Sequence, residues 1–290
     1  DAFNVAVGHD AGVSVTTGQV NTIVGGLAGD AITTGDHNVA IGVNSMGGNT
    51  AANKNTAVGS NSLLSFNVTT DTDTLNTAVG YEAGKSMTTG VSNTILGGTA
   101  GDALTDADFN VAVGMGALSA DTLGSKSTAI GQSALNAQNF TTATDSFNTA
   151  VGFQAGLSVT TGQFNSLIGA QAGLALTTGG RNTVNGFGAL GADTLGSRAV
   201  AIGFGALDAQ NFTTATDNYN VAVGYDAGGA ITTGTQNTIV GSLALDAADT
   251  GAANVAVGYQ ALTADTKGQN NVAVGHNALA TQNLTTATNS

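Results

Sequence analysis

Few side chains in this chain could carry out acid–base or metal chemistry. Cysteine is absent, which excludes disulfides, thiolate metal sites and cysteine nucleophiles. The three histidines, His9, His37 and His276, share no ligand spacing, and Glu82 is the only glutamate. No acidic pair recurs outside the turns, so the paired carboxylates that hydrolyse glycosides are not indicated. We therefore predict that the protein has no catalytic residue and is not an enzyme.

Two acidic segments are the best candidates for a metal site. Residues 71–73 and 102–108 could offer aspartate oxygens to calcium. Neither segment matches an EF-hand loop or the glycine-rich calcium repeat of β-rolls. We interpret both as solvated turns, and we predict no metal-binding residue, no cofactor-binding residue and no cofactor.

The charge of the chain excludes two classes of partner. Its 290 residues include 6 Lys+Arg against 19 Asp+Glu, which gives a formal net charge of -13. Such a chain lacks the basic surface that binds a phosphate backbone or an anionic membrane. It also contains no run of about 20 apolar residues. We predict neither nucleic-acid binding nor a membrane span.

An internal repeat indicates how the chain is organised. A five-residue phrase of the type Asn-Val-Ala-Val-Gly occurs sixteen times. Successive phrases begin at Asn4, Asn21, Asn38, Asn55 and Asn76, which are three equal steps followed by a longer one, and the same cycle then recurs. The cycle defines four blocks within a single repeat array over 1–290: 1–72, 73–144, 145–216 and 217–288. We expect this array to be a segment of a longer fibre.

Asparagine opens fourteen of the sixteen phrases, and Ser127 and Ala199 open the other two. Stacked coils place equivalent residues above one another, so the amides can hydrogen-bond along the column. We predict a structural Asn ladder, with no catalytic use, that tolerates gaps at Ser127 and Ala199. Its members are Asn4, Asn21, Asn38, Asn55, Asn76, Asn93, Asn110, Asn148, Asn165, Asn182, Asn220, Asn237, Asn254 and Asn271.

The length of each coil indicates the fold class. The short step between phrases leaves no room for a crossover helix between parallel strands, which excludes helical repeats. Residues 5–7 and their copies predict a strand of about four or five residues, and residues 14–18 predict a second short strand that ends at Gly18. We predict an all-β fold, a parallel β-solenoid (β-roll or β-helix) of sixteen coils.

The first strand of each coil has apolar residues on both of its faces. The second and fourth phrase positions are Val, Thr, Ile or Leu in nearly every coil, and the third is mostly Ala, with Ile or Leu in the second coil of each block. A solvent-facing strand would alternate apolar with polar residues. We predict that one face lines the coil interior and that the other meets another chain, with the small third-position residues packed around an axis. Asn185, at a fourth position, breaks this pattern.

Two phrases carry a family resemblance that extends over the whole chain. Asn76-Thr-Ala-Val-Gly-Tyr-Glu-Ala-Gly84, followed by Thr88-Thr-Gly90, and Asn254-Val-Ala-Val-Gly-Tyr-Gln-Ala-Leu262 resemble the repeats of phage and bacterial tail-fibre proteins. They are also similar to the head repeats of trimeric autotransporter adhesins. The resemblance implies a homotrimeric, side-by-side or intertwined fibre outside a cell or on a virion that serves attachment.

The long fourth coil of each block carries two further features. The only Asn-x-Thr sequons stand there, at Asn67, Asn139, Asn211 and Asn283, and they are either glycosylation sites or a loop motif that was copied with the block. Apolar residues also recur in this coil, and we expect them to fix the loop to the fibre. They are Phe66, Phe140, Phe212 and Leu284.

These observations favour a structural shaft of an extracellular homotrimeric fibre that serves host or surface attachment. The expected partners are further copies of the chain and, through a tip outside this segment, a cell-surface glycan or receptor. The alternative is a self-assembling extracellular filament without a separate tip. An ice- or carbohydrate-binding solenoid is less favoured, because adjacent residues such as Thr16 and Thr17 point to opposite faces and present a single rank of Thr.

Overall fold

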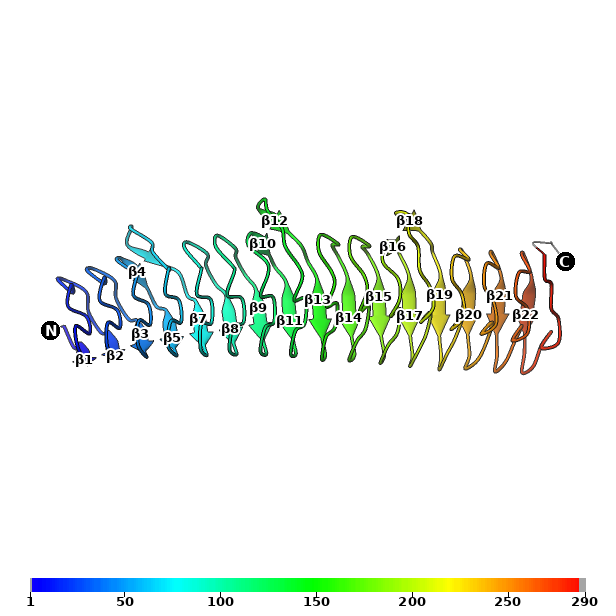
Figure 1. The fold of residues 1–290 in the computed structure, drawn as a ribbon, viewed down its shortest axis with the longest axis horizontal. Helices are drawn as coiled ribbons and strands as arrows, with labels where there is room; N and C mark the ends of the chain where they lie inside the picture. The colour runs from blue at the N-terminus through cyan, green and yellow to red at the C-terminus, as the bar shows by residue number, and fades with distance from the viewer. Residues whose placement is uncertain (1, 287–290) are drawn as a thin grey trace. The chain divides into compact units, whose positions relative to one another are not determined.

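The computed structural model describes residues 2–286 of the chain. It consists of two compact units, Asp1–Phe147 and Asn148–Ser290. The described residues contain strands, turns and bends and no helix. Each unit is a parallel β-solenoid in which one repeat makes one coil (Figure 1), and the two units together have about sixteen coils. The predicted fold class is confirmed.

One long parallel sheet runs through the coils of each unit. Every strand in it has three residues, from the second to the fourth phrase position, because the fifth-position glycine leaves the extended conformation. Equivalent residues pair in register, as in Val5↔Thr22. In the first unit the strands are β1 (Val5–Val7), β2 (Thr22–Val24), β3 (Val39–Ile41), β5 (Thr56–Val58), β7 (Thr77–Val79), β8 (Thr94–Leu96), β9 (Val111–Val113) and β11 (Thr128–Ile130). In the second unit they are β13 (Thr149–Val151), β14 (Ser166–Ile168), β15 (Thr183–Asn185), β17 (Val200–Ile202), β19 (Val221–Val223), β20 (Thr238–Val240), β21 (Val255–Val257) and β22 (Val272–Val274).

The prediction of a second strand in every coil is wrong. Residues 14–18 form turns and bends. The amides of Thr16, Thr17 and Gly18 all converge on the carbonyl of Thr33, at 2.9, 3.2 and 3.2 Å. Convergence on one acceptor replaces the evenly spaced bonds of a strand ladder.

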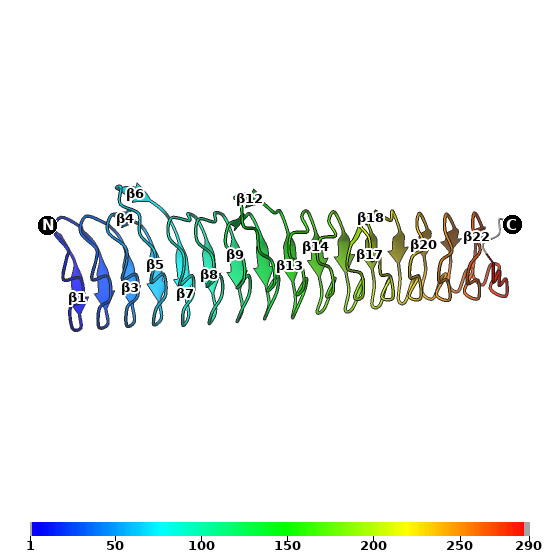
Figure 2. The same cartoon turned by 45° about the horizontal axis from the view of Figure 1, so that its top comes forward.

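Among residues 2–286, second strands of two residues form only beside the long coils. They make three small parallel pairs whose loops stand out from the coils around them (Figures 1 and 2). The pairs are β4 (Ala52–Asn53) with β6 (Thr72–Asp73), β10 (Gly124–Ser125) with β12 (Thr144–Asp145), and β16 (Gly196–Ser197) with β18 (Thr216–Asp217). Each pair therefore ties the extra residues of a long coil to the coil before it.

The fifth phrase position requires glycine for two reasons. At Gly97 the backbone angle φ is 138°, a conformation that residues with a side chain rarely adopt. A Cβ atom at Gly97 would also lie 2.7 Å from the carbonyl carbon and oxygen of Gly114 in the next coil. The stacked backbones are thus too close for any side chain between them.

The third phrase position lies inside the coil and not at an axis between chains. Ile95 and Ala112, the middle residues of β8 and β9, are fully buried within their own unit. The side chain of Ile95 occupies the space beside two glycines, because a Cβ at Gly84 or Gly101 would lie 3.0 or 3.4 Å from its Cδ1. A large residue in the second coil therefore fills the core of two coils, which corrects the prediction that these small residues pack around an axis.

Each coil turns its corners at residues in the left-handed conformation. Three columns hold them, namely the residue before the Asn position and the second and fourth residues after the phrase glycine. Many are bulky, such as Phe109 (φ 59°) and Leu118 (φ 54°), although this conformation costs about 1–2 kcal/mol for residues with a side chain. At Leu118 the burial of the whole side chain in the core offsets this cost.

Candidate functional site

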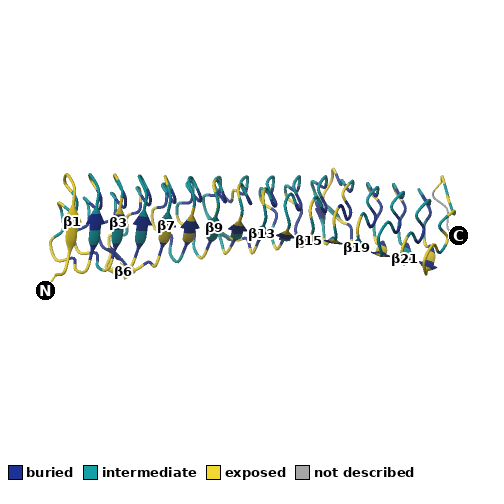
Figure 3. Ribbon diagram, turned by 90° about the horizontal axis from the view of Figure 1, so that it is seen from below, coloured by how far each residue is buried: buried dark blue, intermediate teal, exposed yellow. Residues whose placement is uncertain are grey.

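A surface of uncharged and mostly apolar side chains covers the outside of the long sheet in each unit. In every three-residue strand from β2 onward the middle residue is buried, whereas the first and last residues are partly or fully exposed (Figure 3). We call the first and last residues of all strands of the long sheets, β1 included, the outer face. They are Val, Thr, Ile or Leu, apart from Ser166 and Asn185, and no charged side chain stands among them.

Two flanking columns extend the outer face on either side. They are the residue before the Asn position and the residue after the phrase glycine, and many of them are aromatic, such as Phe109 and Tyr81. With three exceptions, Val13, Leu27 and Leu279, every exposed large apolar side chain among the described residues lies on the outer face or in these columns. Soluble monomers rarely expose so continuous a stretch of apolar side chains.

Aromatic and basic residues in the flanking columns stack on one another. Phe187, Phe204 and Tyr225 follow each other in successive coils with ring centroids 5.4 Å apart. In the other column, Arg198 lies over the ring of Tyr219 at 5.6 Å and its Nε is 2.9 Å from Asp217. Neighbouring coils thus hold the flanking side chains in fixed positions beside the outer face.

The Asn column hydrogen-bonds mainly to the backbone. At Asn93, Oδ1 accepts the amide of Asn110 in the next coil at 2.9 Å, and Nδ2 donates to the carbonyl of Ala107 at 2.7 Å. Amide-to-amide bonds along the column are longer, as from Asn93 to Asn76 at 3.2 Å. Asn93 is fully buried, so its amide satisfies backbone groups that no water reaches.

The structure also shows which side chains form hydrogen bonds at Ser127 and Ala199, the two positions of the column that lack Asn. Above Ala199, the amide of Asn220 donates to Oδ1 of Asn218 at 2.9 Å, so a residue in the long coil replaces the missing acceptor. At Ser127, the hydroxyl accepts from Nε2 of Gln138 at 2.8 Å and contacts the hydroxyl of Ser146. Gln138 recurs as Gln210 and Gln282, and Ser146 stands at the same block position as Asn218, but the contact of these residues with the gaps depends on the fold of the long coil.

A buried carboxylate fixes the long coil in the second, third and fourth blocks. At Asp193, Oδ1 accepts the amides of Gly196 and Phe212 at 3.0 and 3.1 Å, and Oδ2 accepts from Nε2 of Gln210 at 2.6 Å. Burial raises the pKa of Asp193 despite these hydrogen bonds. Asp121 and Asp265 make the same set of contacts. The sequence analysis did not single out these residues, although their recurrence at one position of the block was visible.

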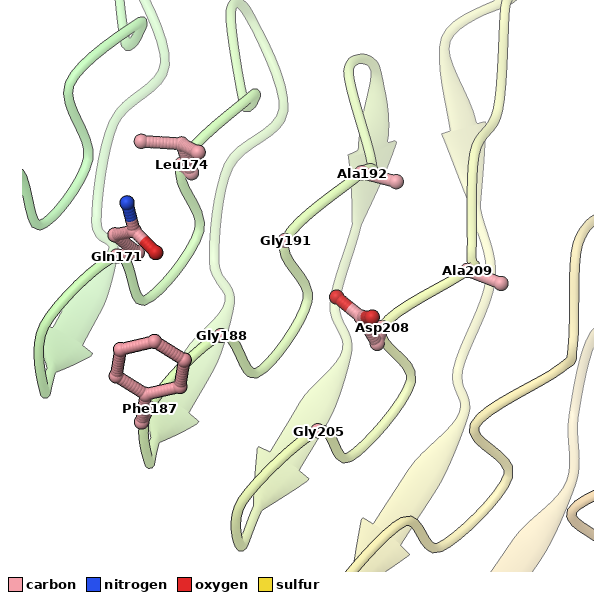
Figure 4. A pocket seen from close by; sticks show the side chains of 9 residues that line it. All are labelled: Gln171, Leu174, Phe187, Gly188, Gly191, Ala192, Gly205, Asp208 and Ala209. Atoms are coloured by element: carbon pink, nitrogen blue, oxygen red, sulfur yellow. The ribbon is translucent and has the colours of Figure 1, made fainter.

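A hollow opens on the second unit next to the stacked rings. Its volume is about 420 Å³, and its larger side chains are Gln171, Leu174, Phe187 and Asp208 (Figure 4). Small residues leave the space open, namely Gly188, Gly191, Ala192, Gly205 and Ala209. Burial and the neighbouring Asp226 carboxylate raise the pKa of Asp208. The hollow thus combines one aromatic ring with an amide and a carboxyl group.

The sequon asparagines lie at the surface of the long coils. Asn67, Asn139 and Asn283 are exposed and Asn211 is half-buried. Each side-chain oxygen accepts from a Thr hydroxyl in the preceding coil, at 2.9–3.1 Å.

The apolar residues of the long coils fix them to the body of the solenoid in three blocks. Phe66 is fully buried and Phe140 and Phe212 are 5% exposed, so the expectation is confirmed for these rings. Phe66 stands two positions earlier in its coil than the other two, so it is not their equivalent. Leu284 is half-buried.

The histidines and aspartates considered as metal ligands either have structural roles or lie too far apart to share a metal ion. The three histidines are exposed. Asp71 accepts from Asn53 at 2.6 Å and Asp73 from Lys54 at 2.5 Å, so both hold the loop of the first long coil. Asp108 accepts the amide of Val91 at 2.8 Å. Among the residues that the structure describes, no group of three His, Asp or Glu side chains is placed to hold a metal ion.

The column of threonines that contains Thr16 and Thr33 forms hydrogen bonds within the protein. Hydroxyls such as those of Thr16 and Thr33 donate to the carbonyl of the next coil, at 3.0 and 3.1 Å. The hydroxyl groups that would have to match an ice lattice therefore form hydrogen bonds between stacked coils.

No protein-family model, curated protein or solved structure matches this chain. The part of the chain that the structure describes has no helix long and apolar enough to cross a membrane.

Proposed function

We propose that the chain is the shaft of an extracellular homotrimeric fibre that serves attachment, and that its copies associate through the outer face. The observation that carries this proposal is the outer face itself, which is mostly apolar, free of charge and present on every strand of both long sheets. Burying one Val or Ile side chain contributes about 1.5–3 kcal/mol. Repeated along two sheets, this term is large enough to hold the copies together.

A second copy of the chain fits the outer face better than an unrelated partner. The face repeats once per coil, with strands in exact phase from coil to coil. A globular partner would cover only a few coils, whereas another copy presents the same period along its entire length. Closed rotational symmetry then places identical residues of the copies at the same height around a common axis. The number three comes from the resemblance to tail-fibre and trimeric adhesin repeats.

The function of such a shaft is mechanical. It holds a binding tip, located outside this segment, away from the structure that anchors the fibre. The tip would contact a cell-surface glycan or receptor, and the shaft would need neither a catalytic group nor a cofactor. The net charge of -13 keeps the remaining surfaces of neighbouring fibres apart.

A pair of double variants tests this proposal. Ile41→Asp with Ile168→Asp places one carboxylate on the outer face of each unit, and an unpaired carboxylate buried between chains is strongly destabilising. Val13→Asp with Leu279→Asp makes the same change at exposed sites off the outer face. We expect the first variant to lower the mass in light scattering toward that of one chain and the second to leave it unchanged. Equal masses for the two variants would refute association through the outer face.

A carbohydrate-binding solenoid is the second candidate, and the hollow beside Phe187 is the observation that favours it. Sugars stack on aromatic rings and hydrogen-bond to carboxylates and amides, which Asp208 and Gln171 supply. A glycan array probed with the protein and with Phe187→Ala tests this function. Binding that is lost in the variant would support it, and no binding by either protein would exclude it.

A further inference from the structure

One residue interrupts the apolar column formed by the last residues of the strands on the outer face. Asn185 ends β15 and pairs in register with Ile168 and Ile202, the last residues of the neighbouring strands β14 and β17. The last residue of every other strand in the long sheets is Val, Ile or Leu. An exposed amide thus stands within an otherwise apolar column.

The side chain of Asn185 has no role within its own chain. It is exposed, and within the described residues its amide makes no hydrogen bond, in contrast to the buried Asn column on the other side of the sheet. Packing between copies would bury this amide among the apolar side chains of the outer face. A buried amide without a partner is costly, whereas amides of neighbouring copies can donate to and accept from one another.

The repeat makes register a real difficulty for this protein. Because the four blocks are equal in length and nearly alike, a copy displaced by one block would still present three of its four blocks to matching surfaces. The equivalents of Asn185 in the other blocks are Ile41, Val113 and Val257. Displacement by a block therefore places each Asn185 against an apolar residue, and only copies at equal height bring the Asn185 side chains together.

We propose that Asn185 sets the register of the associated copies, by pairing with Asn185 of the other copies where their outer faces meet. The inference rests on the proposed association of copies. A single polar residue in an apolar seam is an established way to select one alignment at some cost in stability.

Disulfide trapping tests this inference. Because the chain has no native cysteine, only introduced cysteines can form disulfides. Val151 and Val223 end β13 and β19 and occupy the same position in successive blocks, so they lie opposite each other only in copies displaced by one block. Chains with Val151→Cys and chains with Val223→Cys, distinguished by a size tag, are co-expressed and mildly oxidised. Products that join two like chains report equal height, and products that join unlike chains report displacement.

The comparison is made in three backgrounds. With Asn185 present we expect products of like chains almost exclusively, and with Asn185→Val we expect the fraction of unlike-chain products to rise about tenfold. Ser166→Val is the matched control, a polar-to-apolar change on the outer face of the preceding strand, and it should leave the fraction at its original value. An equal fraction in all three backgrounds, with the copies still associated, would overturn the role of Asn185 alone. A monomeric protein without crosslinks would overturn both this inference and the proposed function.

Discussion

Replacing Asn93 with alanine should destabilise the solenoid far more than the loss of one small side chain would suggest. The substitution removes the acceptor of the Asn110 amide and the donor to the Ala107 carbonyl. Both backbone groups are buried, and no nearby residue replaces the amide as Asn218 does above Ala199. Each unsatisfied buried group costs about 1–3 kcal/mol, so we expect the two groups together to cost about 2–6 kcal/mol.

Urea unfolding followed by circular dichroism measures this loss. Asn139→Ala is the matched control, because Asn139 is exposed and its only hydrogen bond in the structure is accepted from Thr122 at 3.1 Å. We expect the control to change the unfolding free energy by less than about 0.5 kcal/mol. Hydrogen exchange at the Asn110 amide gives an independent measurement, since this proton loses its acceptor only in Asn93→Ala.

The reasoning would be refuted by an Asn93→Ala protein that unfolds with the same free energy as Asn139→Ala. Such a result would mean that strand pairing and apolar burial stabilise the coils, with no contribution from the Asn column. Faster exchange at Asn110 without a change in unfolding free energy would limit the role of the column to local order.

Three further changes have expected outcomes. Gly97→Ala should prevent folding or lower the melting temperature by more than about 10 °C, because the added Cβ would collide with Gly114. A loss of about 3 kcal/mol or more in unfolding free energy corresponds to such a shift. An unchanged melting temperature would contradict the argument that the coils stack too closely for a side chain. Burial raises the pKa of Asp193 in the folded state, so the stability that its protonated form contributes is lost as the pH rises through the folded pKa. The wild type should therefore lose stability relative to Asp193→Asn as the pH rises above about 4, the ordinary pKa of Asp, and parallel pH profiles would count against this. Ala199→Ser should supply an acceptor for Nδ2 of Asn218, which is buried without a partner in the structure, and should stabilise the protein by about 0.5–1.5 kcal/mol in urea unfolding.

The fold class could be predicted because the repeat restricts each coil so strongly. The short coil period, with glycine at a fixed phase, allows only short parallel strands, which the structure confirms. The second strand was predicted wrongly because residues such as Ser14 and Val15 have a strand-like pattern, whereas the hydrogen bonds of this segment converge on one carbonyl. Local propensity gives no information on such convergence.

The orientation of the strands was harder to predict than their positions. Both faces carry apolar residues, so alternation could not show which face lies inside the coil. The packing of Ile95 beside Gly84 and Gly101 decides it, and these glycines stand outside the strand that holds Ile95. Left-handed corners at bulky residues such as Leu118 were equally hidden, because the sequence signals for that conformation are Gly and Asn.

The molar mass of the purified protein tests the central claim most directly. Light scattering, with an unboiled denaturing gel run in parallel, reports how many chains associate. The proposed fibre shaft predicts a mass near three times 28.1 kDa. A mass of 28.1 kDa at all concentrations tested would mean that the outer face does not join copies of this chain, and would contradict the account.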